Sequence, residues 1–145
     1  MKRLLLAAAA VWCLSGTALA CDCVRFIPGA PNWDRDIKAV ADHATVILDG
    51  ELVRPLGPLL EPAIVRPIRV LKGPKQKDYK VGVISDCALV LRAPDVKVGQ
   101  KLRLVLYGTP ELYEASRCAN LQSAEFEAAV EAACSSAPLP RAGGD

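Results

Sequence analysis

Three consecutive residues near the start of the chain, Cys21-Asp22-Cys23, have the types and spacing that could do chemistry. Cysteine thiolates bind zinc, and thiols in an oxidising compartment form disulfides. If the chain is cut after Ala20, Cys21 becomes the first residue and carries a free α-amine beside its carbonyl. A lipid could also be attached to a cysteine at this position. The fate of Cys21 therefore decides which chemistry is open to the protein.

The first twenty residues have the pattern of a secretory signal peptide. Lys2 and Arg3 supply positive charge, residues 4–14 are apolar, and Ala18-Leu19-Ala20 offers small residues at the cleavage site. The apolar run is shorter than the roughly 18 residues that a transmembrane helix needs. We therefore expect cleavage after Ala20 and a secreted or periplasmic protein. Residues 21–134 are expected to form one domain, followed by a flexible tail over residues 135–145.

The cysteine count leaves one residue over. The chain has six cysteines, and removal of Cys13 with the leader leaves five. An odd number implies a free thiol, a bond between chains, or another group on Cys21. Lipoprotein signals usually place Leu three residues before the cysteine, where this chain has Ala18, so a lipidated Cys21 is the alternative. Zinc binding by Cys21 and Cys23 is disfavoured, because His43 is the only histidine and no second cysteine pair completes a set of four ligands.

Charge and composition argue against several classes of function. Removal of Lys2 and Arg3 lowers the 18 basic residues to 16, equal to the 16 acidic residues. A near-neutral chain gives no electrostatic case for nucleic-acid binding. No spacing combines a nucleophile, a base and an orienting group, and no glycine-rich phosphate loop is present, so we expect neither an enzyme nor a cofactor. A local basic cluster consists of Lys72, Lys75, Lys77 and Lys80. It is either a solvated turn or a contact patch for an acidic partner.

Hydrophobic periodicity predicts a mainly β protein with helices near its ends. Alternation predicts strands over residues 45–53, 63–71, 79–85, 88–92 and 100–107, with Leu102, Leu104 and Leu106 facing inward. Gly50 and Pro67 indicate bulges or an edge. Helices are expected from residue 32 or 34 to 41 and over 123–133, and residues 108–111 form either a helix start or a tight turn. Five short strands favour a small antiparallel barrel, with a sandwich as the alternative.

Several segments together resemble the netrin-like domain, which is the fold of the N-terminal part of tissue inhibitors of metalloproteinases and of secreted bacterial relatives. The matching pieces are Cys21-Asp22-Cys23, residues 41–53, residues 69–73, the lone Cys87, residues 98–105 and Arg117-Cys118. They cover about 100 residues in the same order. The resemblance implies a five-stranded OB-type barrel with helices packed beside it.

The resemblance also implies a disulfide framework. Cys21 would pair with Cys87, and Cys23 with Cys118. Such bonds close loops of about 66 and about 95 residues, for which the chain-entropy model gives roughly 4–5 kcal/mol each. They would tie the N-terminal arm across the barrel, and Cys134 would have no partner.

In the resembling inhibitors, the amine and carbonyl of the N-terminal cysteine chelate the catalytic zinc of a protease. The resemblance therefore implies an inhibitory edge at Cys21, Asp22 and Cys23, with a secreted zinc metalloprotease or another extracytoplasmic protein as partner. The inhibitors carry a small residue at the position of Asp22, and that residue enters the specificity pocket of the protease. Asp22 departs from this pattern and disfavours binding, because an unpaired carboxylate costs several kcal/mol to desolvate. We expect a disulfide-stabilised binding module, with a structural envelope domain or lipoprotein as the alternative. His43, at a helix–strand junction, is expected to pack partly buried.

Overall fold

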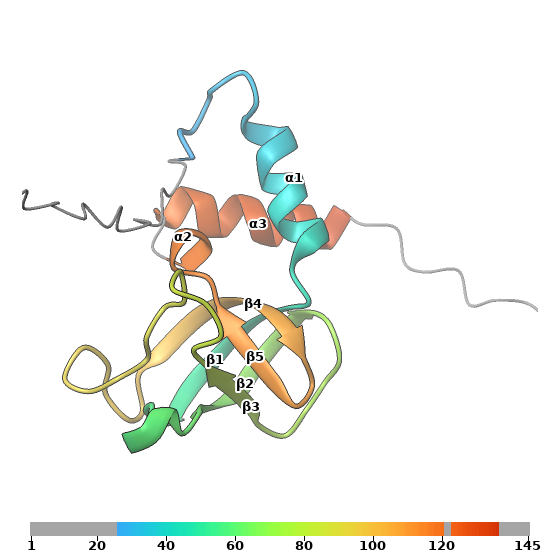
Figure 1. Cartoon of the computed structure of the whole chain (residues 1–145). Coiled ribbons are helices and arrows are strands. Elements are labelled where there is room, and N and C mark those ends of the chain that lie inside the picture. Colours follow the sequence, from blue (N-terminus) through green and yellow to red (C-terminus); the bar gives the residue numbers. More distant parts are fainter. Residues whose placement is uncertain (1–25, 121–122, 137–145) are drawn as a thin grey trace, which may run out of the picture.

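The computed structural model describes residues 26–120 and 123–136 and contains five strands and four helices in these ranges. The strands are β1 (Val46–Arg54), β2 (Ala63–Lys72), β3 (Tyr79–Gly82), β4 (Lys101–Thr109) and β5 (Leu112–Ala115). The helices are α1 (Trp33–His43), the short 3-10 helix η1 (Pro58–Leu60), α2 (Arg117–Asn120) and α3 (Ala124–Ser136). The expected mainly β protein with flanking helices is confirmed. Figure 1 shows α1, α2 and α3 together beyond one end of the sheet, with η1 at the opposite end.

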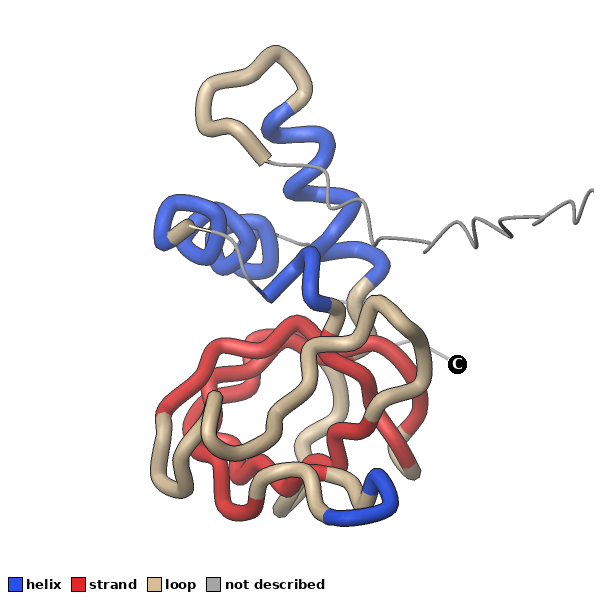
Figure 2. The backbone as a smooth tube through the Cα atoms, turned by 60° about the vertical axis from the view of Figure 1, so that its left-hand side comes forward, coloured by secondary structure: helices blue, strands red, loops and turns tan. Residues whose placement is uncertain are grey.

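The five strands follow one another in a closed order, β1-β2-β3-β5-β4 and back to β1. β1 pairs antiparallel with both β2 and β4 along most of its length. The closure is uneven, however. β3 pairs only with the first three residues of β2, and β3 meets β5 in a parallel pairing of two residue pairs. The tube in Figure 2 shows the strands curving around a common interior beneath the helices.

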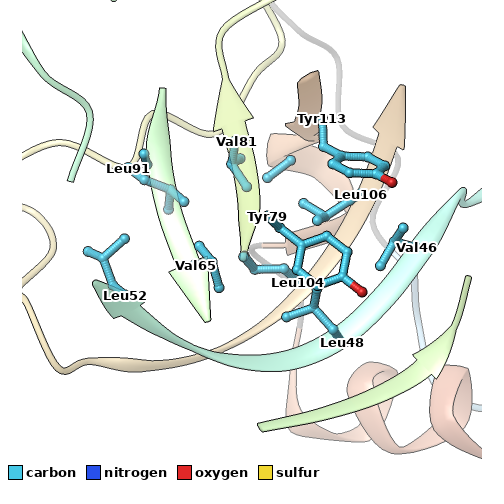
Figure 3. Packing of buried hydrophobic residues seen from close by; sticks show 12 residues of the cluster. Val46, Leu48, Leu52, Val65, Tyr79, Val81, Leu91, Leu104, Leu106 and Tyr113 are labelled. Carbon is cyan, nitrogen blue, oxygen red and sulfur yellow. The ribbon is translucent and has the colours of Figure 1, made fainter. Parts of the chain in front are cut away.

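Apolar side chains from every strand fill the interior of this ring. Alternate residues of β1 and β4 point into it, as the sequence predicted for Leu104 and Leu106. Tyr79 and Tyr113 lie in the same cluster with ring centroids 5.6 Å apart. Figure 3 shows these side chains converging on one centre. The buried members are Val46, Leu48, Leu52, Ala63, Val65, Tyr79, Val81, Leu91, Leu104, Leu106, Tyr113 and Ala115.

Gly50 permits the close approach of β1 and β2. The pairing register shifts between Asp49 and Gly50, where Gly50 faces Pro67 of β2. A Cβ atom on Gly50 would lie 2.5 Å from Cγ1 of Val65 and 2.7 Å from Cδ1 of Leu48. The predicted irregularity at Gly50 and Pro67 is therefore confirmed, and no side chain fits at this position without movement of the interior.

A second apolar cluster lies between the outer face of the ring and the helices. Ile47 of β1 and Val105 of β4 point outward, yet both are buried. They pack with Ile37 of α1 and with Phe126 and Val130 of α3. Under the helices, β1 and β4 are thus buried on both faces.

Four charged side chains connect this helical layer to the sheet. Asp49 faces Arg69 of β2 on one side and Arg103 of β4 on the other. Its Oδ1 accepts a hydrogen bond from Nε of Arg103 at 2.7 Å, and its Oδ2 accepts one from Nη2 of Arg69 at 3.0 Å. Glu131 of α3 completes the ring, at 2.7 Å from Arg69 and 2.8 Å from Arg103. We call these four residues the charge ring.

One predicted strand is wrong. Residues 88–92 form no strand, although Ala88 and Leu91 are buried, because the segment makes only an isolated bridge between Ala88 and Ser116. The fifth strand is instead β5, which forms a hairpin with β4 through a tight turn. α3 extends to Ser136, so the predicted tail begins later than residue 135. The remainder of that tail lies outside the described residues.

Candidate functional site

Two cysteines that lie 31 positions apart in the sequence come from neighbouring backbone segments. Cys87 follows β3, and Cys118 is the second residue of α2. The N–H of Arg117 donates to the carbonyl of Cys87 at 2.9 Å, next to the bridge between Ala88 and Ser116. Both cysteines are half-buried, and both are disulfide-bonded. We call residues 83–87, the end of β5 and α2 the cysteine platform.

Glu114 holds the loop that carries Cys87. Its Oε2 accepts hydrogen bonds from the N–H groups of Ile84 at 2.8 Å and Ser85 at 2.6 Å, and its Oε1 accepts one from the Ser85 hydroxyl at 2.8 Å. The Ser85 hydroxyl in turn accepts from the N–H of Cys87 at 3.3 Å. Hydrogen bonds to a charged acceptor are stronger than neutral ones. One carboxylate of β5 thus fixes the position of the loop.

Asn120 holds the segment that carries Cys118. Its side-chain oxygen accepts from the N–H of Val105 at 2.8 Å, and its side-chain nitrogen donates to the Val105 carbonyl at 3.0 Å. The same nitrogen donates to the Ser116 carbonyl at 2.7 Å. This side chain therefore joins the four-residue α2 to β4, and a helix too short to be stable alone is held in one orientation.

The predicted partners of these cysteines, Cys21 and Cys23, lie outside the described residues together with Asp22. The pairings with Cys87 and Cys118, and the inhibitory edge, therefore stay predictions. The first described residue of this part of the chain is Phe26, which packs on Phe126 with ring centroids 4.8 Å apart. Trp33 contacts the same ring edge-on at 6.5 Å. The chain thus enters the structure on the helical layer.

A groove of about 370 Å³ opens next to Phe26, between α1 and β4. Its apolar walls come from Phe26, Val40 and Tyr107, and its polar lining includes His43. Burial raises the pKa of the Tyr107 hydroxyl, so this group stays protonated at neutral pH. The expectation of a partly buried His43 is wrong: the end of α1 turns its imidazole to solvent, and the side chain is exposed.

The basic cluster divides into two parts. Nζ of Lys72 donates to the carbonyls of Ala41 at 2.6 Å and Asp42 at 2.7 Å, where α1 ends. This ammonium satisfies two carbonyls of the helix terminus and lies at the negative end of the helix dipole. Lys75, Lys77 and Lys80 remain exposed. One member of the cluster is therefore structural, and the predicted alternatives apply to the other three.

Two tyrosines of the strands pack inside the ring that the strands form. Tyr79 and Tyr113 are fully buried, and the Tyr79 hydroxyl donates to the Pro74 carbonyl at 2.6 Å. Base or sugar stacking needs exposed aromatic faces. These two rings cannot supply them.

Cys134 is a free, half-buried thiol that packs against the outer apolar cluster. Burial raises the pKa of this thiol, which lowers its reactivity. Within residues 26–120 and 123–136, no three or more His, Cys, Asp or Glu side chains gather closely enough to hold a metal ion. In the same ranges, no helix has the length and apolar character needed to cross a membrane.

Sequence reasoning missed the two side chains that hold the platform, Glu114 and Asn120. Glu114 lies between Tyr113 and Ala115, which are both buried. This alternation is typical of a strand and is the signal that could have indicated β5 and the outward position of Glu114. Asn120 carried no comparable signal, because its three partners are backbone groups of β4 and of the turn before α2.

Comparison of the chain with protein-family models, with curated proteins and with solved structures found no match.

Proposed function

We propose that this protein is a secreted, disulfide-stabilised binding module whose binding edge is Cys21-Asp22-Cys23, held on the cysteine platform. The observation that carries this proposal is the adjacency of Cys87 and Cys118, both disulfide-bonded, on segments joined by a hydrogen bond of 2.9 Å. Bonds from Cys21 and Cys23 to these two sulfurs would fix an arm at two points. Fixing an arm before it binds lowers the ordering cost of binding.

The partner class that we propose is a secreted zinc metalloprotease. A catalytic zinc site keeps one coordination position open, and a neutral α-amine is a good donor for it. Once the arm is fixed, the Cys21 amine and carbonyl would meet the zinc together. The hydrogen bonds of Glu114 and Asn120 support this proposal, because they hold both segments of the cysteine platform in place before a protease binds.

We also propose that the sheet is an OB-type barrel of the netrin-like kind. The closed strand order, the parallel contact of β3 with β5 and the position of the helices at one end support this assignment. The uneven closure is compatible with the partly open barrel of OB folds.

The first experiment establishes what Cys21 is. The protein is expressed with residues 1–20, and the exported form is analysed by intact mass and N-terminal sequencing. The proposal expects a start at Cys21, a free amine and the mass of two intramolecular disulfides. A diacylglycerol mass would instead establish the alternative, a lipoprotein anchored through Cys21. A blocked amine or a start elsewhere would overturn the inhibitor proposal.

The second experiment measures inhibition of a panel of secreted zinc proteases with fluorogenic peptide substrates. Wild-type protein is compared with a form that carries one extra alanine before Cys21 and with Asp22→Ser. The extension should abolish inhibition, because it replaces the amine by an amide. Asp22→Ser should inhibit at least about tenfold more tightly, because the cost of burying a carboxylate disappears. Equal inhibition by the extended form, or none by either wild type or Asp22→Ser, would contradict the proposal.

A further inference from the structure

The largest of the grooves described lies between α1 and α3 and has a volume of about 590 Å³. Figure 1 shows these helices crossing beyond the end of the sheet. Ile37 of α1 and Ala129 and Ala133 of α3 line its floor, and Trp33 forms a wall. None of its lining residues belongs to the cysteine platform. The groove is therefore a separate feature from the proposed edge at Cys21.

The volume of this groove is in the range of pockets that hold ligands or side chains of a partner, about 300–1,000 Å³. The apolar floor alone would accept an aliphatic side chain. The groove is open to solvent along the side where Asp34 and Ala132 are exposed, so a partner can enter it there.

The charge at the rim selects among partners. Two carboxylates line the groove, Asp34 and Asp42. Asp42 is ion-paired with Lys38, so the negative charge left for a partner is that of Asp34. Ser136, the last residue of α3, lies on the same rim, where the helix dipole places partial negative charge. The half-buried indole of Trp33 offers a face on which a cation can rest. All three features favour a positive charge and disfavour an acidic segment.

We propose that this groove binds a peptide segment of a partner protein in which an arginine or lysine lies two positions from an aliphatic residue. The aliphatic side chain occupies the floor over Ile37 and Ala133, and the cation lies between Trp33 and Asp34. This interaction surface is additional to the edge at Cys21, and either can fail without the other.

The test uses the fluorescence of Trp33. The form that begins at Cys21 has lost Trp12 with residues 1–20, so Trp33 is its one tryptophan and serves as the reporter. This form is titrated with two synthetic peptides, Gly-Ser-Leu-Ser-Arg-Ser-Gly and the same peptide with Glu in place of Arg. We expect a saturable change with the Arg peptide and at least about fivefold weaker binding of the Glu peptide. No saturable change up to millimolar Arg peptide, or equal binding of the two, would overturn the proposal.

Two substitutions on one helix locate the binding. Ala132 is exposed and lines the groove, whereas Ala128 is exposed and does not. Ala132→Phe should weaken the Arg peptide at least about tenfold by filling the groove, and Ala128→Phe should change it less than about twofold. Asp34→Asn should weaken it about two- to fivefold. If Ala132→Phe binds like Ala128→Phe, the peptide lies elsewhere and the proposal is wrong.

The same assay tests whether the protein's own C-terminal segment, rather than a partner, occupies the groove. The residues after Ser136 include Leu139 and Arg141, which have the chemistry that the groove selects. In the form that begins at Cys21, the double substitution Leu139→Ser and Arg141→Glu should leave the affinity for the Arg peptide unchanged. An affinity about tenfold higher in this variant would mean that the protein's own C-terminal segment fills the groove, and this would overturn the assignment to a separate partner.

Discussion

The interior of the strand ring and the layer between the ring and the helices are both buried, but they are held in different ways. The interior contains apolar side chains from every strand and two tyrosines, and no charged residue is buried among the described residues. The helical layer has a smaller apolar cluster, and the charge ring of Asp49, Arg69, Arg103 and Glu131 connects it to the sheet. Acid and salt should therefore weaken the attachment of the helices while leaving the interior unchanged.

The largest effect is expected inside the ring. Leu104 is 1% exposed, and Leu104→Asp places a charge without a partner among apolar side chains. Such a charge costs at least about 4 kcal/mol, so the variant should be unfolded. Circular dichroism and resistance to proteolysis measure this. Ile68→Asp, at a position that is 57% exposed on β2, is the control and should fold. A folded, protease-resistant Leu104→Asp protein would show that the inward face of β4 is assigned wrongly.

The next effect tests the helical layer. Phe126 is 1% exposed and contacts the rings of both Phe26 and Trp33. Phe126→Ala should lower the free energy of unfolding by about 3–5 kcal/mol, which urea denaturation measures. Glu125→Ala, on the exposed face of the same helix, is the control.

Two probes sharpen this experiment. Trp33 fluorescence reports on the helical layer, and the far-ultraviolet circular dichroism reports on the whole fold. Coincident transitions in Phe126→Ala would indicate that both layers unfold as one unit. A loss below about 1 kcal/mol would contradict the packing of Phe126 described above.

A smaller effect is expected from the charge ring. Arg103 has a side chain that is 15% exposed and donates twice to Asp49 while contacting Glu131. Arg103→Met should cost about 1.5–3 kcal/mol, the range for hydrogen bonds to charged groups. Arg66→Met removes an exposed pair with Asp78 and should cost less than about 0.5 kcal/mol. Equal losses in the two variants would show that the charge ring is no stronger than an ordinary surface pair.

The smallest effect is a dependence on pH. Hydrogen bonds from Arg103, and then from Arg69, lower the pKa of Asp49, and the bond from Arg69 lowers the pKa of Glu131. Both carboxylates therefore stabilise the fold above their unfolded pKa values of about 4, and this stabilisation is lost as the pH falls through the lowered folded values. The urea midpoint should fall from about pH 5 downward. Asp49→Asn should flatten this decline, and an unchanged slope would exclude Asp49 as its source.

Much of the sheet could be predicted because alternation reports which face of a strand is buried. Alternation assigns Leu104 and Leu106 to the interior, and both are buried there. The same signal failed at residues 88–92, because burial of Leu91 does not require a hydrogen-bonded ladder. It failed again at β5, a strand of four residues behind Thr109-Pro110, a pair that is also typical of a helix start. The run Val46-Ile47-Leu48 breaks alternation because helices cover the outer face of β1.

The candidate site was less predictable than the fold. The resemblance to the netrin-like domain implies Cys87 and Cys118 as anchors of the N-terminal arm, and this stays a prediction. The structure shows that the two cysteines lie on adjacent segments. Their supports, Glu114 and Asn120, act on backbone groups, and contacts of this kind depend on tertiary arrangement rather than on a local pattern. The groove between α1 and α3 was equally hidden, because its two walls are about 100 residues apart in the sequence.

The uneven closure of the strand ring has a consequence for solubility. Beyond Val65, β2 pairs only with β1, so its second half presents an open edge that another chain could extend by strand addition. Pro67 has no N–H group to offer to an added strand. The exposed side chains of Arg66 and Arg69 lie beside it, each paired with a carboxylate. Pro67, which disturbs the regular ladder of β2, thus also disfavours edge-to-edge pairing with another chain.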